Sequence, residues 1–277
     1  MIRRIAGALV RAVLVVLLVA TPSLLLPGIS ADVTQIVTLV AIFAAALTIF
    51  EYASVYPGLV EFRNAPPFNR LRFASLFVTV LLISLVVRGE NDATAVTRAV
   101  TAFGTNIGLA IDLPYSPVRQ IVLLLPEDTT FAQVARVRTA AGISYFVSML
   151  ALAIFYFFVR VRNWPLQGGP FNVWINLPTF DPTTGGDVVQ RLERDARFNI
   201  IVGFTLPFFI PAVLKASESV FGQVTLENPQ TMIWVVAAWA FLPASLLMRG
   251  LAMGRIAELI ERKRKSTAAA QKGLQPA

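Results

Sequence analysis

Three acidic residues beside predicted membrane spans are the groups in this sequence that could carry out chemistry. Glu51, next to Tyr52, ends a long apolar run, and a carboxylate there could bind a proton or a cation. Asp181 and Asp187 lie in a later loop rich in proline and glycine, where they could hold Mg²⁺ together with a phosphorylated lipid. We favour structural roles for all three: Glu51 can pair with an arginine of its own loop or lie among headgroups, and Asp181 and Asp187 suit a turn and a helix cap.

The residue types that most enzymes and redox proteins need are absent. The chain of 277 residues contains no cysteine, which excludes disulfides, thiol nucleophiles and cysteine-bound iron–sulfur clusters. It contains no histidine either, and histidine is a frequent ligand of haem iron and transition metals and the commonest general base. The motifs of serine hydrolases and phosphate-binding loops are also missing. We therefore predict no catalytic residue, no metal site and no cofactor.

Composition and hydropathy place the chain in a membrane. Only 14% of its residues are charged, compared with about 25% in a typical soluble domain, and the mean hydropathy is +0.68. The apolar residues gather in runs of membrane-spanning length. We predict an all-α polytopic membrane protein with about six transmembrane helices and with amphipathic interfacial helices in its loops. The expected spans are residues 5–26, 33–53, 73–87, 142–159, 200–214 and 232–248.

The limits of this membrane domain leave alternatives open. Residues 1–265 are expected to form one integral-membrane domain, followed by a disordered cytoplasmic tail at 266–277. Residues 1–31 are either a retained first span, which we prefer, or a cleaved signal peptide. Residues 118–125 lie between prolines and are too short to span, so they form a re-entrant, interfacial or buried segment.

Two amphipathic helices are expected between the spans. The first has an apolar stripe at helical spacing, backed by threonines, and would lie flat on the membrane or dock on the bundle. Its stripe consists of Val96, Val100, Phe103, Ile107 and Ile111. The second is capped by Asp187 and precedes the fifth span.

The distribution of basic residues indicates the orientation. With six spans and the N-terminus inside, 18 of the 24 lysines and arginines face the cytoplasm, whereas the 16 acidic residues divide evenly. This asymmetry obeys the positive-inside rule. Because arginine far outnumbers lysine, as in GC-rich bacterial genomes, we predict a bacterial inner-membrane protein with both termini cytoplasmic. The expected partners are the lipid bilayer, anionic lipid at the basic inner face and other membrane proteins, but not nucleic acid.

The loop between the second and third spans is a candidate docking surface. Three prolines stiffen it and aromatic residues can pack within it, so its charged groups would be held in fixed positions. It would dock on the loop around residues 160–198 or on a partner protein; the alternative is a plain inner-face tether that only satisfies the positive-inside rule. The residues of this surface are Glu51, Glu61, Arg63, Arg70 and Arg72.

Prolines also interrupt the last two spans. Pro207, Pro211 and Pro243 are predicted helix kinks, and each leaves a carbonyl that needs another hydrogen-bond donor. Broken helices can line transport sites, although packing explains such kinks as well. A G-x-x-x-G pattern at Gly250 and Gly254 lies at the membrane edge and is a weak dimerisation signal.

Three functions follow from these patterns, in order of preference. The first is a non-catalytic subunit, assembly factor or scaffold of a membrane protein complex, because the spans are almost free of charged groups while the loops are elaborate. The second is a transporter or channel that uses the kinked fifth and sixth spans. The third is a lipid-modifying enzyme that uses Glu51, Asp181 or Asp187.

Overall fold

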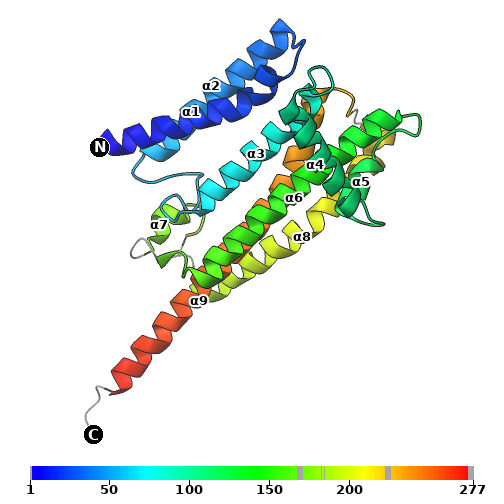
Figure 1. Cartoon of the computed structure of the whole chain (residues 1–277). Helices are drawn as coiled ribbons and strands as arrows, with labels where there is room; N and C mark the ends of the chain where they lie inside the picture. Colours follow the sequence, from blue (N-terminus) through cyan, green and yellow to red (C-terminus); the bar gives the residue numbers. More distant parts are fainter. Residues whose placement is uncertain (1, 167–170, 182, 184, 222–225, 274–277) are drawn as a thin grey trace.

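The computed structural model describes residues 2–166, 171–181, 183, 185–221 and 226–273. Within these ranges the regular structure is entirely helical (Figure 1). The helices are α1 Ile2–Leu25, α2 Ala31–Ala53, α3 Phe68–Arg88, α4 Ala95–Ile111, α5 Pro117–Val122, α6 Phe131–Val161, α7 Val173–Asn176, α8 Val188–Phe221 and α9 Pro229–Gly273. Six of them, α1, α2, α3, α6, α8 and α9, are long and apolar enough to cross a membrane. The predicted all-α polytopic membrane protein is confirmed.

Two helices continue where the sequence suggested breaks. The amphipathic helix expected after Asp187 is the first part of α8, which runs without interruption into the fifth span. Residues 266–273, expected to belong to a disordered tail, extend α9, while 274–277 lie outside the described residues. Good helix formers and an ion pair of 2.8 Å between Lys265 and Glu261, one turn apart, favour this extension. Figure 1 shows the end of α9 projecting far beyond the other helices.

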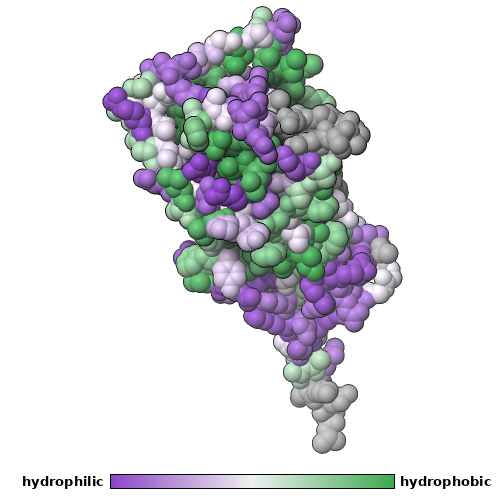
Figure 2. All heavy atoms as spheres, turned by 90° about the vertical axis from the view of Figure 1, so that its right-hand side faces the viewer, coloured by the Kyte–Doolittle hydropathy of each residue, from purple (hydrophilic) through white to green (hydrophobic). Residues whose placement is uncertain are grey.

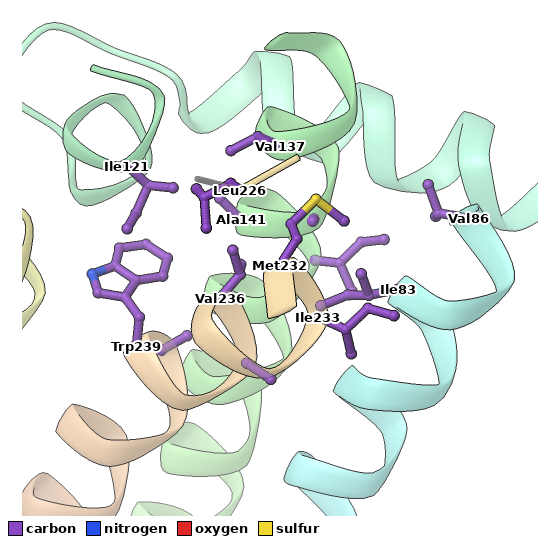
Figure 3. Close-up of a cluster of buried hydrophobic side chains, with 14 of the residues drawn as sticks. Ile83, Val86, Ile121, Val137, Ala141, Leu226, Met232, Ile233, Val236 and Trp239 are labelled. Atoms are coloured by element: carbon purple, nitrogen blue, oxygen red, sulfur yellow. The ribbon is translucent and has the colours of Figure 1, made fainter. Parts of the chain in front are cut away.

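The largest hydrophobic core lies where α3, α5, α6 and α9 meet. Figure 3 shows its buried side chains converging from these four helices, among them Ile83, Ile121, Val137, Met232 and Trp239. We call this end of the bundle the outer end, following the predicted orientation. The opposite, inner end carries residues 54–67, the described residues between 162 and 187, and the last turns of α9. Figure 2 shows hydrophilic residues crowding the end of the body from which α9 projects, next to a hydrophobic band.

The helix α4 docks on the bundle with a face that overlaps only one edge of the predicted stripe. Val96 and Phe103 of that stripe are exposed and Val100 and Ile111 pack half-buried against the main core, whereas Gly104 and Gly108 are buried against α6. A Cβ atom built on Gly142 of α6 would lie only 2.5 Å from the Cα atom of Gly108, so the two backbones touch. In a membrane, small residues let two helices approach closely, and large apolar side chains can face lipid instead of the protein core.

The short segment at 118–125 is buried on one face. The α5 helix begins after Ser116, whose hydroxyl caps it by accepting from the Arg119 N–H at 3.1 Å. Val118 and Ile121 are at most 1% exposed and pack into the main core, whereas Leu123 is 56% exposed. The segment therefore packs one face against α6 and α8.

The first two helices form a hairpin at the side of the bundle (Figure 1). Leu18 and Leu26 join the main core, and the Gln230 amide donates to the Ser23 hydroxyl at 3.1 Å. The α2 helix packs on α1 and buries only Ala41 and Glu51. The hairpin is therefore anchored mainly through the outer half of α1.

Candidate functional site

The Glu51 carboxylate at the inner end of α2 is held by backbone amides. Its side chain accepts hydrogen bonds from the N–H groups of Gly58, Leu59 and Val60 at 2.9–3.2 Å, and the residue is 3% exposed. Three donors can replace the water that a buried carboxylate loses. The arginine pair that we expected for Glu51 is thus replaced by a loop that folds back over the carboxylate.

Arg63 caps the same helix from the other side. Its guanidinium donates to the carbonyl oxygens of Glu51, Ser54 and Val55 at 2.7, 2.9 and 3.0 Å. These carbonyls follow the last turn of α2, where the helix dipole favours a positive charge. Burial, and then the nearby Arg4 charge, lower the pKa of Arg63 below its ordinary value. The side chain nevertheless stays charged, because arginine is not deprotonated in proteins.

Glu61 joins the loop to α9. Its carboxylate forms two hydrogen bonds with Arg249, at 2.6 and 2.8 Å, and accepts a third from the Thr179 hydroxyl at 2.9 Å. Arg72 lies nearby, donates to the Ser245 hydroxyl at 3.2 Å and packs its guanidinium over the ring of Phe68. Because the pair of Glu61 and Arg249 is joined at two points, it fixes both the position and the orientation of the loop relative to α9.

The loop at 54–67 also docks on the loop between α6 and α8. The Phe62 N–H donates to the Asn176 carbonyl at 2.6 Å, and the Asn64 N–H donates to the Asn176 side chain at 3.0 Å. The Trp164 indole donates to the Ala65 carbonyl at 3.1 Å and packs against the ring of Phe62. Of the predicted docking residues, Glu51, Glu61, Arg63 and Arg72 therefore contact this chain itself, and Arg70 remains exposed.

The three candidate acidic residues do not share a site. Asp181 accepts from the Thr183 N–H at 2.8 Å, and Asp187 accepts from Arg264 at 2.7 Å and from the Val189 N–H at 3.1 Å. The hydrogen bond from Arg264, followed by that from Val189, lowers the pKa of Asp187. Among the described residues, no three acidic side chains gather closely enough to hold a metal ion.

The prolines predicted as kinks, Pro207, Pro211 and Pro243, lie inside the continuous helices α8 and α9. Pro211 has no N–H to offer the carbonyl of Pro207, and the buried indole of Trp239 donates to that carbonyl at 3.0 Å instead. A Cβ atom on Gly203 would lie 2.8 Å from the Pro243 carbonyl, so α8 and α9 are in backbone contact there. These prolines thus lie at a tight helix interface.

The Gly250 motif serves the same interface. A Cβ atom on Gly250 would lie 2.8 Å from the Ala196 carbonyl of α8. In this fold, the first glycine of the predicted weak dimerisation motif is therefore used for packing within the chain.

Three cavities at the inner end surround Tyr52. One of about 400 Å³ lies between the hairpin and α3 and is lined by Arg11, Arg63 and Arg70, and an adjoining one of about 310 Å³ adds Arg4. A third, of about 640 Å³, lies beside the pair formed by Glu61 and Arg249. The first is of the size that binds small ligands.

Two groups escaped the sequence analysis. The Arg11 guanidinium lies 4.6 Å from the centre of the Tyr52 ring, a contact between helices that sequence spacing does not reveal. At the outer end, the Asp112 carboxylate is 5% exposed and lies 2.9 Å from Arg119 and 3.4 Å from Arg138. The position of Asp112 between an amphipathic helix and Pro114 was the available signal, but its partners come from two other helices.

No protein-family model matches the sequence, and comparisons with curated proteins and with solved structures find no match either.

Proposed function

We propose that this chain is a non-catalytic component of a membrane protein complex, in a bacterial inner membrane with both termini in the cytoplasm. The observation that carries the proposal is the isolation of α2. Although 23 residues long, this helix buries only Ala41 and Glu51. Its packing partner among the described helices is α1, which in turn meets α3 and, more lightly, α9.

The exposed face of α2 has the residue spacing of a helix–helix interface. Ile36, Leu39, Phe43, Leu47 and Phe50 recur at spacings of three and four residues, and each is at least 39% exposed. Such spacing aligns side chains along one stripe of a helix, where a second helix can interlock with them. A partner helix of another membrane protein fits this stripe.

The inner-end contacts support a non-catalytic role. Glu51, Glu61 and Asp187 accept hydrogen bonds from backbone amides or from arginines of this chain. These bonds fix the loops and attach the hairpin to the bundle. The architecture is that of a rigid body carrying one projecting hairpin.

Site-specific cross-linking tests this proposal. A photo-reactive benzophenone amino acid replaces Phe43 on α2 or, as a matched control, Phe209 on α8, which is similarly exposed at 62%. After irradiation in cells, we expect position 43 to give one discrete protein adduct and position 209 to give none.

Native mass spectrometry after gentle detergent extraction provides the stoichiometry. We expect a fixed ratio between this chain and the protein cross-linked at position 43. A lone monomer that cross-links only to lipid at both positions would contradict the proposal.

A further inference from the structure

We propose that the groove between the inner half of the hairpin and the start of α3 binds one anionic lipid. The phosphate lies among Arg11, Arg63 and Arg70, and an acyl chain follows Leu14 and Phe73. We call this place the lipid groove; it comprises the adjoining cavities of about 400 and 310 Å³. A groove that holds one lipid molecule is more specific than the general attraction of a basic surface to anionic membranes.

The charge of the groove is one-sided. Its lining includes Arg4, Arg11, Arg63 and Arg70 but neither aspartate nor glutamate. The neighbouring third cavity differs, because there Glu61 balances Arg249. Arginine binds phosphate oxygens through two parallel hydrogen bonds, which makes it suited to a phosphate headgroup.

Two of these arginines have donors to spare. Arg11 lies within the first span, donates to the Gly7 carbonyl at 2.6 Å and contacts Tyr52, which leaves other N–H groups of its guanidinium available. Arg70 is exposed. Among the described residues, no carboxylate forms an ion pair with either. A charge inside a membrane span is costly without a counter-ion, and a lipid phosphate supplies one.

The groove continues from a polar mouth to an apolar wall. Leu14 and Val15 follow Arg11 by one turn of α1, and Phe73 follows Arg70 by one turn of α3. One turn places these side chains about 5 Å deeper in the membrane than the arginines. A free phosphate would use the mouth alone, whereas a phospholipid uses both parts, so the apolar wall identifies the ligand as a lipid.

The Gly7 position explains how Arg11 reaches the mouth. A Cβ atom on Gly7 would lie 3.0 Å from Nη1 of Arg11, so a larger residue there would crowd the guanidinium. The side chain folds back towards the inner end over this glycine, as long basic side chains in membrane helices do.

The test uses the full-length chain in nanodiscs of phosphatidylcholine with a minor fraction of phosphatidylglycerol. After transfer to a mild detergent, native mass spectrometry counts the phosphatidylglycerol that remains bound. We expect one molecule per chain, and at least a tenfold weaker retention in the variant Arg11→Gln/Arg70→Gln. The matched control, Arg194→Gln/Arg197→Gln, removes the same charge from exposed positions at the inner end and should retain the lipid.

Two further variants guard against misfolding and non-specific binding. Arg70→Gln alone changes an exposed residue and should weaken retention in part. Thr48→Phe fills the cavity without changing charge and should also weaken it. Three results would each overturn the proposal. They are an equal loss of bound phosphatidylglycerol in the Arg194→Gln/Arg197→Gln control, full retention in Thr48→Phe, and displacement of the lipid by inorganic phosphate at equal concentration.

Discussion

At the scale of single residues, two charges at the inner end of α2 are stabilised by backbone groups. Glu51 is held by three amide N–H groups and Arg63 by three carbonyls, all from residues 51–60. Sequence reasoning identified both residues but expected Glu51 to pair with an arginine of its loop or to lie among headgroups, because it cannot foresee where a loop points its peptide groups. Backbone neutralisation makes the loop sensitive to small changes at one side chain.

Replacement of Glu51 by glutamine should destabilise the protein by about 2 kcal/mol, because hydrogen bonds to a charged acceptor are lost and an amide group faces backbone N–H donors. Thermal unfolding in detergent would show a lower midpoint than in the wild type. The matched variant Glu127→Gln changes an exposed acid and should leave the midpoint in place. Equal midpoints for Glu51→Gln and the wild type would mean that the amide bonds contribute little.

The indole of Trp239 offers a second residue-scale prediction. In Trp239→Phe the carbonyl of Pro207 loses its donor, which should cost about 1–3 kcal/mol for a buried unpaired group. In the background Pro211→Ala the restored N–H can bond that carbonyl, so the same tryptophan change should cost less. Thermal unfolding of the wild type, Trp239→Phe, Pro211→Ala and the double variant measures how far the cost of the tryptophan change depends on Pro211. Strict additivity would show that Trp239 acts through packing alone.

At the scale of elements, the six spans could be predicted because long apolar runs determine them. The face that α4 turns towards the bundle could not be predicted in the same way. Its apolar stripe has the spacing of a buried face, yet only one edge of it, with Val100 and Ile111, packs on the core, while Val96 and Phe103 are exposed. The glycines at 104 and 108 carry the better signal, and they lie on the face that meets α6. Docking of the first loop on the loop around residues 160–198 was one of the predicted alternatives. The individual contacts of Asn176, Trp164 and Arg249 could not be predicted, because they join segments more than 90 residues apart.

One methyl group added at the α4–α6 contact should strongly destabilise the protein. In Gly142→Ala the new Cβ would lie 2.5 Å from the Gly108 backbone, which cannot move aside as a flexible side chain would. We expect a destabilisation of about 1–3 kcal/mol and a looser α4, seen as faster proteolysis of the segment at 89–130. Gly185→Ala, where a Cβ meets no atom within 4 Å, is the control. Unchanged stability and proteolysis in Gly142→Ala would exclude a rigid α4–α6 contact.

At the scale of the whole molecule, the inner end is where distant segments are joined. The loop at 54–67, the loop at 162–187 and α9 meet there through Glu61, Trp164 and Arg255, whose guanidinium donates to the Trp164 carbonyl at 3.3 Å. The outer end is joined by the apolar core, to which α1 contributes Leu18. Removal of residues 1–31 as a signal peptide would take this side chain out of the core, so retention of the first span stays a prediction with a direct structural consequence.

The proposed orientation can be tested because the chain contains no cysteine. In Asp128→Cys and Ser266→Cys, each made singly, the exposed thiol is the only one in the protein and lies at the outer or the inner end, respectively. With 18 of 24 basic residues on the inner side, a membrane-impermeant maleimide should label position 128 in intact spheroplasts and position 266 only after lysis. An N-terminal epitope tag that stays on the mature chain would show that the first span is retained. The opposite labelling pattern would reverse the membrane sides assigned to the inner loops and to the lipid groove, and labelling of both positions before lysis would show a dual or altered topology.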